Sequence, residues 1–359
     1  MAQPCRVQVR PTRAEIDRGA LAHNLRAVEG RVGGAAVFAV IKADAYGHGL
    51  VPIAERLVRE GVGGLAVALA EEGLQLRAKG IGGPILVLNG IYDGAHREVV
   101  EAGLTPVVYD EADAARFEAL GAAVHVKVDT GMTRLGVRAL GPFLDRFPGL
   151  RVAGLMTHLA SADEDPEATR AQLDAFDAAI ALARGRGHAP VLHAANSAGA
   201  LLWPRARYDL VRVGVALYGV RPEGGDASLD LRPVMRVVTS VARVVEVPAG
   251  TRVGYGGTWT AARPSRVATL AIGYGDGYHR AASNRGHAVI RGVRCPLVGR
   301  VSMDLTGADV TDLPACERGD EAIMVGPELP AADVARATGT IAYEVLCSIA
   351  PRVPRVYLG

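Results

Sequence analysis

The sequence lacks the features that mark several large classes of protein. Its 359 residues include two tryptophans, five phenylalanines and four cysteines, and Cys5, Cys295, Cys316 and Cys347 have no paired or CxxC spacing. Scattered cysteines of this kind indicate reduced thiols. Residues 1–19 contain no apolar stretch typical of a signal peptide, and no apolar run approaches membrane-spanning length. We therefore expect a cytoplasmic protein with no bound metal and no membrane contact.

The charge is nearly balanced, which argues against a polyanionic partner. The chain has 40 Lys and Arg against 38 Asp and Glu, a net charge of +2. It contains no block of basic residues and no aromatic motif of RNA-binding domains, so we expect no nucleic-acid partner. The hydrophobic fraction of 49% is that of an ordinary globular protein. The length suffices for one large domain and a smaller one.

Short apolar runs alternate with helical patterns over the first two thirds of the chain. Eight runs are predicted strands: 36–41, 65–69, 85–88, 106–109, 124–128, 152–157, 191–193 and 211–217. Apolar residues with helical spacing cover 15–29, 51–59, 71–79, 95–102, 111–119 and 166–184. This α/β alternation predicts a parallel sheet covered by helices, and eight units fit a TIM (β/α)8 barrel. A doubly wound open sheet is the alternative, disfavoured because no GxGxxG motif follows an early strand.

The pattern changes after residue 233. Runs rich in β-branched residues and separated by close turns follow at 237–247, 267–272, 288–293, 297–301, 305–310 and 321–325. Helical spacing returns only at 331–337 and 342–349. We therefore predict a barrel domain over residues 10–233 and a mainly β C-terminal domain over 234–359, with residues 1–9 as a candidate addition to the second domain.

The first predicted strand ends on a lysine, in the stretch AVIKADAYGHG at residues 39–49. A lysine held at the end of a buried strand favours its neutral, nucleophilic form, the form that condenses with an aldehyde. A lysine whose amine reaches into solvent is the commoner case for an arbitrary strand. Lys42 is nevertheless a candidate for Schiff-base chemistry.

Other predicted strands also end in polar residues. In a barrel the carboxyl ends of all strands share one face, where the active site lies. The strand-end residues of interest are Lys127, Arg134, His158, Ser197, Arg212 and Gly214. The segments after the seventh and eighth strands commonly bind phosphate in barrels. A hydroxyl at a helix start (Ser197) and a glycine that admits close backbone approach (Gly214) suit that task.

Several segments closely resemble motifs of the alanine racemases. They are the Lys42 stretch, residues 127–136, MTH at 156–158, 193–197, 212–219, VGYGGT at 253–258, IGYGDG at 272–277, GRVSMD at 299–304 and Tyr343-Glu344. The resemblance extends over nearly the whole chain. One departure is Ser302, which stands before Met303 where the family often has cysteine. We expect its effect to be mild.

The resemblance implies pyridoxal 5'-phosphate as the cofactor and alanine as the substrate. Lys42 would bind the cofactor covalently, Tyr46 would pack beside it, His158 would be a further cofactor-binding residue, and Arg212 would face the pyridine nitrogen. The phosphate would be contacted by Ser197, Gly214, Val215 and Tyr343. Arg134 and the backbone of Met303 would contact the substrate. Lys127 matches a position often carbamylated in the family, and the entryway residues would be Asp163, Tyr274, Arg280 and Arg300.

Racemisation removes a proton from one face of Cα and returns one to the other, which requires two acid–base groups. The resemblance assigns these roles to Lys42 and Tyr255. Tyrosine has a reference pKa of about 10, so work near pH 7 requires a shift of roughly three units, about 4 kcal/mol. We hypothesise that a hydrogen-bonded His158–Arg212 chain supplies part of the cationic environment. Arg212 itself cannot accept a proton, so the pyridine nitrogen should stay neutral.

Tyr255 and Met303 resemble residues that the family supplies from the partner subunit, which implies a head-to-tail homodimer with shared active sites. The product D-alanine would serve peptidoglycan synthesis, or the enzyme would catabolise alanine. Two alternatives remain. One is a pyridoxal-phosphate-dependent amino-acid decarboxylase of the same architecture, disfavoured by the motifs around Tyr255 and Met303. The other is a non-catalytic pyridoxal-phosphate carrier, which resembles the barrel alone.

Overall fold

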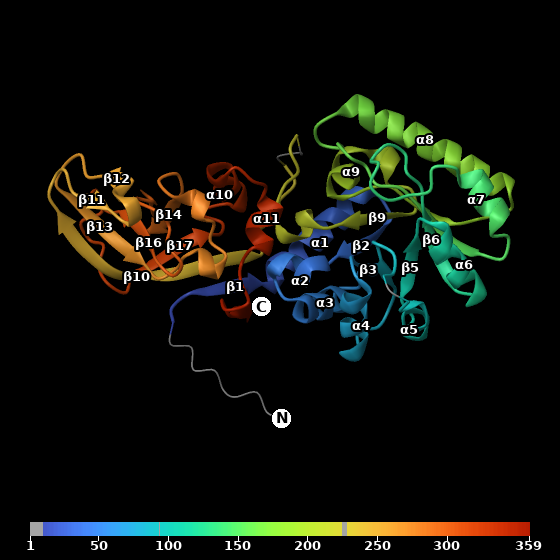
Figure 1. The fold of residues 1–359 in the computed structure, drawn as a ribbon, viewed down its shortest axis with the longest axis horizontal. Helices are drawn as coiled ribbons and strands as arrows, with labels where there is room; N and C mark the ends of the chain where they lie inside the picture. The colour runs from blue at the N-terminus through green and yellow to red at the C-terminus, as the bar shows by residue number, and fades with distance from the viewer. Residues whose placement is uncertain (1–9, 93, 225–227) are drawn as a thin grey trace. The chain divides into compact units, whose positions relative to one another are not determined.

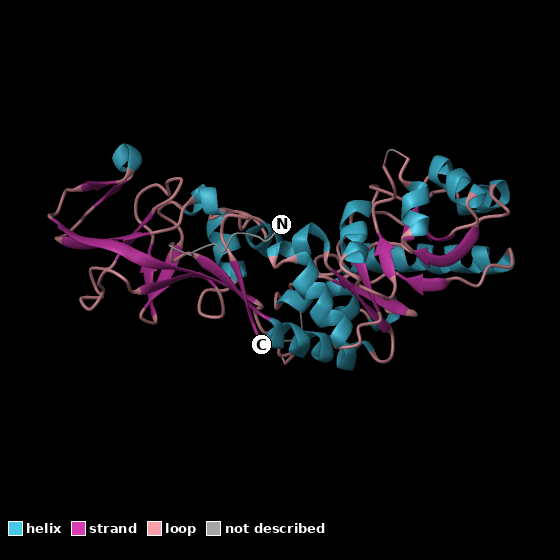
Figure 2. Ribbon diagram, turned by 90° about the horizontal axis from the view of Figure 1, so that it is seen from below, coloured by secondary structure: helices cyan, strands magenta, loops and turns pink. Residues whose placement is uncertain are grey.

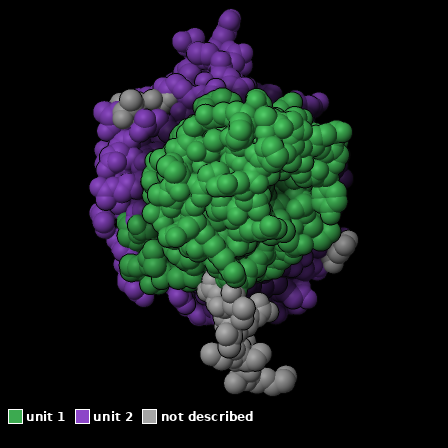
Figure 3. Space-filling view, turned by 90° about the vertical axis from the view of Figure 1, so that its left-hand side faces the viewer, with its two compact units in different colours: residues 1–19, 233–359 green, residues 20–232 purple. Residues whose placement is uncertain are grey.

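The computed structural model describes residues 10–92, 94–224 and 228–359. The chain divides into two compact units, coloured separately in Figure 3. The barrel unit comprises residues 20–232, and the described part of the β unit comprises residues 10–19 and 233–359. The suggestion that residues 1–9 belong with the β domain falls outside the described residues.

The barrel unit contains eight strands that pair in parallel, in the order β8-β7-β6-β5-β4-β3-β2-β9. They are β2 (Ala36–Val40), β3 (Gly64–Val67), β4 (Ile85–Val87), β5 (Thr105–Val108), β6 (Ala123–Lys127), β7 (Arg151–Met156), β8 (Val191–His193) and β9 (Leu210–Val213). The two ends of the sheet meet where the N–H groups of Asp209 and Arg212 donate to the carbonyls of Leu192 and Ala195, at 3.1 and 3.0 Å. The predicted (β/α)8 barrel is confirmed, and the open sheet is wrong.

Helices surround the barrel strands (Figures 1 and 2). They are α1 (Arg18–Val32), α2 (Lys42–Gly47), α3 (Leu50–Arg59), α4 (Ala70–Ala78), α5 (His96–Glu101), α6 (Glu111–Ala119), α7 (Leu140–Arg146), α8 (Pro166–Gly185) and α9 (Ser197–Leu202), with 3-10 turns η1 (Pro204–Ala206) and η2 (Val215–Tyr218). Several start at side-chain caps: the carboxylate of Asp110 accepts the N–H of Asp113, and that of Asp165 accepts from Glu167 and Ala168. These caps explain why α6 and α8 begin where the sequence predicts. Residues 215–217, predicted as part of the eighth strand, form a 3-10 turn instead.

The β unit is built around one long strand, β10 (Met235–Val247), which is prominent in Figure 1. Its main sheet has the order β15-β14-β17-β10-β1-β18, and β13 pairs with both β10 and β16. The other strands are β1 (Arg13–Asp17), β11 (Arg252–Val253), β12 (Trp259–Thr260), β13 (Ser265–Leu270), β14 (His287–Ile290), β15 (Val293–Pro296), β16 (Thr306–Asp309), β17 (Glu321–Val325) and β18 (Arg355–Leu358). The helices are α10 (Ala331–Thr338) and α11 (Ala342–Cys347), with 3-10 turns η3 (Tyr255–Gly257), η4 (Tyr274–Asp276) and η5 (Arg280–Ala282).

The first described strand differs from the prediction. The helical spacing over residues 15–29 predicted a helix, and residues 10–19 were assigned to the barrel domain. In the structure β1 pairs antiparallel with β10 and parallel with β18, so residues 13–17 belong to the β unit's sheet. Ala14 and Ile16 are buried, whereas Glu15 between them takes hydrogen bonds from Arg13 and Arg236. This period-two alternation is that of a strand, and the helix begins only at Arg18.

Two predicted strands of the β unit also differ. The run 288–293 is a hairpin of β14 and β15, because Arg291 and Gly292 both have positive φ, 49° and 78°, and turn the chain. The run 297–301 makes a single bridge, between Leu297 and Ala308, and forms no strand. Gly299 has φ 76°, which a regular strand does not allow.

Candidate active site

The residues after β2 form a left-handed turn. Ala43, Asp44, Ala45 and Tyr46 have φ between 52° and 54° and ψ between 40° and 56°. The left-handed conformation costs roughly 1–2 kcal/mol per L-residue, and four in succession are exceptional. Such a segment persists only where the surrounding structure holds it. The half-buried Lys42 stands at the junction between the strand and this turn.

Contacts with two neighbouring elements hold the turn. The carboxylate of Asp44 accepts the N–H of Leu50, 2.7 Å away, at the first residue of α3. The rings of Tyr46 and His48 pack on Tyr218 of η2, with centroids 4.9 and 4.5 Å apart. The sequence predicted the helix after the turn to open near Leu50, as it does. It did not predict the left-handed backbone of residues 43–46.

The strand β9 carries a buried cation, Arg212. Its Nη1 donates to Nδ1 of His193 at 2.8 Å, and its Nη2 donates to the carbonyls of Thr157 and Ala194 at 2.8 and 3.0 Å and to Nδ1 of His158 at 3.3 Å. Burial lowers the pKa of Arg212 to about 9. Every acceptor is neutral, and within the described ranges no carboxylate pairs with this guanidinium. An anion is therefore the partner that this position lacks.

The hydrogen bonds of Arg212 define the tautomers of the nearby histidines. Burial and the charge of Arg212 lower the pKa of His125 to about 4, and they hold the pKa of His158 and of His193 well below the ordinary value. Because arginine only donates, Nδ1 of His193 is an acceptor and its proton lies on Nε2. That Nε2 donates to Nδ1 of His125 at 2.8 Å. All three imidazoles are neutral, so the positive charge of the chain lies on Arg212.

The sequence predicted no role for His125 or His193. A signal was available, because side chains two residues apart on a strand point to the same side. His125 stands two residues before Lys127 on β6, and His193 ends β8. Strand periodicity could thus have placed His125 inside the barrel with Lys127, although not its bond to His193.

Several cationic side chains converge on the same region. The pKa of the buried Lys127 is lowered to about 8, first by burial and then by the charges of Arg212, Arg134 and Lys42. The charge of Asp129 acts in the opposite direction and raises this pKa. The same four cations, Arg212, Lys127, Arg134 and Lys42, also lower the pKa of His158 after its burial. The structure therefore brings these predicted site residues together around His158.

A second group of predicted residues meets at the carboxyl ends of β8 and β9. The hydroxyl of Ser197 accepts the N–H groups of Gly214 and Ala216, at 3.0 and 3.4 Å. A Cβ at Gly214 would lie 2.4 Å from the hydroxyl oxygen of Tyr46, so only glycine fits there. Val215 begins η2 and is buried. Tyr46, Ser197, Gly214 and Val215 form one cluster of backbone and hydroxyl groups suited to a phosphate.

The loop after β6 holds Arg134 in an exposed position. Asp129 accepts the N–H groups of Gly131 and Thr133 at 3.1 and 2.9 Å and an Nε donor of Arg138 at 3.2 Å. Arg134 lines a pocket of about 240 Å³ together with Asp129, Thr133 and Arg138. Asp163, predicted at the entryway, is exposed on the loop before α8.

The remaining predicted residues lie in the β unit. Tyr255 is 73% exposed and lines a pocket of about 390 Å³ together with Arg300. Met303 is 53% exposed, and its carbonyl accepts the N–H of Gly275 at 2.8 Å. Tyr274 donates its N–H to the carbonyl of Ser302 at 3.0 Å, so Tyr274 and Met303 stand on two loops bonded to each other. Arg280 and Tyr343 are also exposed, on η5 and α11.

A buried carboxylate fixes these two loops. Asp276 is fully buried and accepts from Nη1 and Nη2 of Arg10 at 2.5 and 2.6 Å, from Nε of Arg352 at 2.7 Å and from the N–H of Gly273 at 2.9 Å. Arg352 also reaches the carbonyl of Met303 at 3.3 Å. Burial raises the pKa of Asp276, but the hydrogen bonds from Arg10, Arg352 and Gly273 outweigh it, and the net pKa is lowered.

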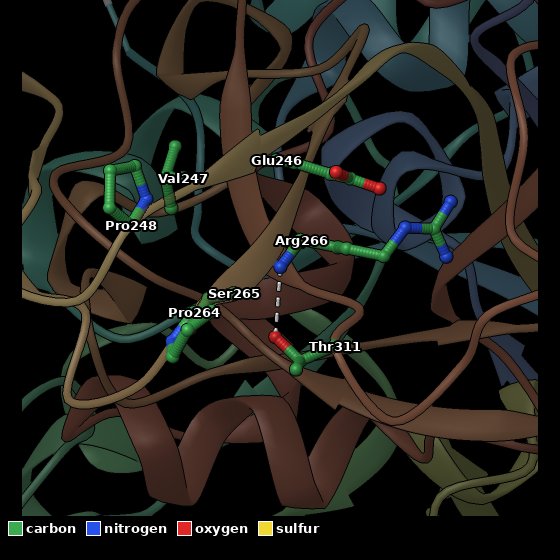
Figure 4. Close-up of a pocket in the computed structure, with 7 residues that line it drawn as sticks. All are labelled: Glu246, Val247, Pro248, Pro264, Ser265, Arg266 and Thr311. Carbon is green, nitrogen blue, oxygen red and sulfur yellow. Dashed lines mark hydrogen bonds between the residues drawn. The ribbon is translucent and has the colours of Figure 1, made fainter.

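A separate pocket of about 530 Å³ in the β unit contains none of the predicted residues. Figure 4 shows its lining, in which the N–H of Arg266 donates to the hydroxyl of Thr311 at 3.0 Å. The other lining residues are Glu246, Val247, Pro248, Pro264 and Ser265. Two prolines and a paired strand edge supply no convergent catalytic groups, so this pocket is not part of the candidate site.

Comparisons with known proteins cover both units. Residues 16–222 match the family model described as "Alanine racemase, N-terminal domain", and residues 234–357 match "Alanine racemase, C-terminal domain". An alanine racemase of Sorangium cellulosum is 46% identical over 97% of this chain and 99% of its own length.

Solved structures agree with the sequence comparisons. The alanine racemase of Streptomyces coelicolor A3(2) has a TM-score of 0.92 and 39% identity, covering 98% of this chain and 99% of its own. The alanine racemase of Bartonella henselae, solved with covalently bound pyridoxal phosphate, has a TM-score of 0.90 and 33% identity, covering 97% and 99% of the two chains. In the described part of this chain, no helix combines the length and apolar character needed to cross a membrane.

The Asp276 network generates a stability prediction. Asp276→Asn should lower the free energy of unfolding by about 3 kcal/mol at pH 7, because it leaves two arginines beside a buried neutral amide. The folded pKa is lowered, so the carboxylate stabilises above its unfolded pKa of about 4, and the benefit is lost as pH falls through the folded value. Urea unfolding at several pH values from 7 down to 2, a range that passes through the unfolded pKa toward the lowered folded pKa, measures the difference between variant and wild type.

Asp312→Asn is the matched control, because Asp312 pairs with Arg263 on the surface. Its loss should stay below about 1 kcal/mol. A difference between Asp276→Asn and wild type that does not shrink at acid pH would show that the ion pairs are not its source.

Proposed function

The chain belongs to the alanine racemase family, and from this we propose the part that its residues play in the reaction. The enzyme is an isomerase that interconverts L- and D-alanine with pyridoxal 5'-phosphate as cofactor. The matched family models span both units, which leaves the decarboxylase and the non-catalytic carrier without support. The strongest structural support for a site that binds an anionic cofactor is the buried Arg212, whose acceptors are all neutral.

The residues present fit the cofactor. A phosphate and an aromatic ring with a phenolic oxygen supply the negative charge that the cations around His158 lack. The N–H groups of Gly214 and Ala216 already converge on the hydroxyl of Ser197 and would serve phosphate oxygens equally well. We propose that Ser197, Gly214, Val215 and Tyr343 hold the phosphate, that Tyr46 packs beside the ring, and that Lys42 binds the cofactor covalently.

When bound, the cofactor withdraws electrons from Cα of the substrate and makes its hydrogen acidic. Arg212 would face the pyridine nitrogen. Because a guanidinium donates and never accepts, the ring nitrogen would remain unprotonated. His125 and His193, both neutral, would hold the guanidinium plane in place through the bond from Nη1 to His193. The withdrawal of electrons would then be moderate, which favours return of the proton to Cα over other reactions.

Lys42 and Tyr255 would carry the proton on the two faces of Cα, each able to remove it or return it. His158 is neutral and accepts a hydrogen bond from Arg212 on Nδ1. Its Nε2–H therefore remains to donate a hydrogen bond to the phenolate oxygen of Tyr255. The hypothesised His158–Arg212 chain is therefore refined: the charge resides on Arg212, and His158 transmits it through a hydrogen bond. Arg134 and the backbone of Met303 would hold the substrate carboxylate.

We propose further that the enzyme is a head-to-tail homodimer with shared sites. In the isolated chain Tyr255 is 73% and Met303 53% exposed, high values for a catalytic ring and an apolar side chain. The exposed Asp163, Tyr274, Arg280 and Arg300 would line the substrate entryway. Among the described residues, Cys295 and Cys316 are free thiols, which agrees with a reducing, cytoplasmic location. There the D-alanine would feed peptidoglycan synthesis, or alanine would be degraded.

The two-base assignment predicts a distinct defect for Tyr255→Phe. Racemisation should fall by a factor of about 10² to 10⁴, because one face of Cα loses its acid–base group. Exchange of the Cα hydrogen of one enantiomer with deuterated water should survive, because Lys42 still serves its own face. Proton NMR of each enantiomer in deuterated water measures both. Tyr92→Phe, a change at another exposed tyrosine, is the control and should behave as wild type. An unchanged racemisation rate in Tyr255→Phe would contradict the assignment.

Shared sites predict complementation between inactive variants. Mixing Lys42→Ala with Tyr255→Phe under conditions of subunit exchange forms heterodimers with one intact site, provided that Tyr255 acts in the partner's site. Half of the dimers are then heterodimers, each with one intact site out of two. Activity should therefore recover to about a quarter of wild type. Activity of the mixture, before and after exchange, is the measurement. If each chain completed its own site, the mixture would stay inactive.

The lowered pKa of Lys127 predicts carbamylation. At a pKa of about 8 the neutral amine is well populated near neutral pH, and its lone pair can attack carbon dioxide with release of a proton. The carbamate would orient Arg134. We expect wild-type activity in carbon dioxide-free buffer to rise on adding bicarbonate, more strongly as pH rises toward 8 and the neutral fraction grows. Lys127→Ala should lose this response and raise KM about tenfold, through loss of one orienting hydrogen bond.

Lys79→Ala, at an exposed lysine after α4, is the control and should keep the bicarbonate response. An identical response in Lys127→Ala and wild type would rule out carbamylation of Lys127 as the cause.

A further inference from the structure

We propose that Glu72 is a positioning residue for Lys42. Its carboxylate binds the first peptide group after the lysine and so sets the direction in which the amine leaves the strand. The proposal rests on the proposed covalent role of Lys42. It concerns a residue on α4 for which neither the motifs nor the strand-end pattern suggested any function.

The carboxylate of Glu72 bridges the segments that follow two neighbouring strands. Its Oε1 accepts the N–H of Ala43 at 2.6 Å, directly after Lys42. Its Oε2 accepts the N–H groups of Ala68 and Leu69 at 2.8 and 3.1 Å, just after β3. Since β2 and β3 are adjacent in the barrel, one side chain ties the Lys42 turn to the next strand end.

The bond to Ala43 acts on the lysine through the backbone. The N–H of Ala43 belongs to the peptide plane that begins at the carbonyl of Lys42, so fixing this plane fixes ψ of Lys42. Ala43 is also the first of the four left-handed residues, with φ 52°. A carboxylate bond to a backbone N–H is charge-assisted and short, as it is here. Without it, the first residue of a conformation disfavoured for L-residues loses its anchor.

Only a carboxylate satisfies all three donors. Glutamine offers one oxygen and one NH₂ group, and the NH₂ group would face a backbone N–H at one end of the bridge. Glu72→Gln therefore gives up either Ala43 or the pair Ala68 and Leu69. Aspartate keeps both oxygens but is one methylene shorter, so it cannot span both ends at the same backbone positions.

Glu71 provides a matched control. It precedes Glu72 in the first turn of α4 and is exposed, and the described residues offer it no hydrogen bond or ion pair. Glu71→Gln removes the same charge from the same helix end, so it reproduces any effect of Glu72→Gln on the helix dipole. A difference between the two variants then reports on the carboxylate bridge alone.

Hydrogen exchange on the cofactor-free protein tests the bridge without relying on activity. In Glu72→Gln the amides of residues 43–46 should exchange at least about tenfold faster than in wild type, while Glu71→Gln should match wild type. Equal exchange in both variants would overturn the proposal. If Glu72→Gln is recovered unfolded, the same comparison is made with Glu72→Asp. Exchange at the wild-type rate at residues 43–46 of Glu72→Asp would then overturn the proposal.

Reconstitution tests the consequence for the lysine. Pyridoxal phosphate alone is added to cofactor-free protein, and covalent attachment is followed by absorbance, then located by borohydride reduction and peptide mass spectrometry. We expect attachment to Lys42 to slow by about 10- to 100-fold in Glu72→Gln, the range expected when a reacting group is misplaced, and kcat to fall more than KM changes. Attachment at the wild-type rate in Glu72→Gln would overturn the proposal.

Lys42→Ala distinguishes a failure of the proposed role of Lys42 from a failure of the proposed role of Glu72. If wild type and Lys42→Ala show the same lack of covalent attachment, the proposed role of Lys42 is wrong. If wild type attaches the cofactor at Lys42 and Glu72→Gln does so equally fast, Lys42 keeps its role and only the role of Glu72 is wrong.

Discussion

The interaction on which the barrel site depends is the burial of the Arg212 guanidinium among neutral acceptors. Two carbonyls and two imidazoles accept its hydrogen bonds, and no described carboxylate balances its charge. Desolvating a cation in this way is costly unless an anion arrives. Burial, and then the charge of Arg212, keep His125, His158 and His193 neutral. The hydrogen bonds that start at Arg212 determine which nitrogen of each imidazole carries the proton. A site built on this residue binds an anion strongly and can donate hydrogen bonds to it but never accept a proton from it.

The backbone beside this cation is as constrained as its charge. Lys42 precedes four left-handed residues, and the contacts that hold them come from distant parts of the chain. Tyr46 packs at a tilt on Tyr218, and its hydroxyl occupies the space that a side chain at residue 214 would fill. The absence of a Cβ at Gly214 thus admits Tyr46 beside the backbone whose N–H groups donate to Ser197. The placement of the lysine and the shape of the phosphate cluster are therefore coupled, and neither can change alone.

The sequence predicted the barrel well because its strands are buried on both faces and read as continuous apolar runs. It also placed polar residues at the correct ends of those strands. It failed at residues 13–17, where Ile16 and Leu21 happen to fit a helical period although Ile16 belongs to a strand. The left-handed turn could not be predicted from Ala43-Asp44-Ala45-Tyr46, since only aspartate among these residue types adopts that conformation with any frequency, and tertiary contacts impose it on all four. The residues of the β unit came only from the resemblance: Tyr255 and Met303 lie on loops, where no periodicity indicates a side chain's direction.

In the proposed mechanism the two units have different tasks, and this difference follows from how each unit is built. In the barrel unit the reactive groups are buried or half-buried and held by strands, so their electrostatics is set within one chain. In the β unit Asp276 and its two arginines hold the loops of Tyr274 and Met303 firmly, yet the side chains at the tips remain exposed. A rigid loop with an exposed tip is suited to enter another surface with little loss of conformational entropy. At 73% exposure, Tyr255 is not desolvated within its own unit. Under the proposed two-base role, Tyr255 would become an effective base only against a surface that supplies desolvated, cation-rich surroundings, so the proposed assembly would be a condition for the second half of the chemistry and not merely a route to stability.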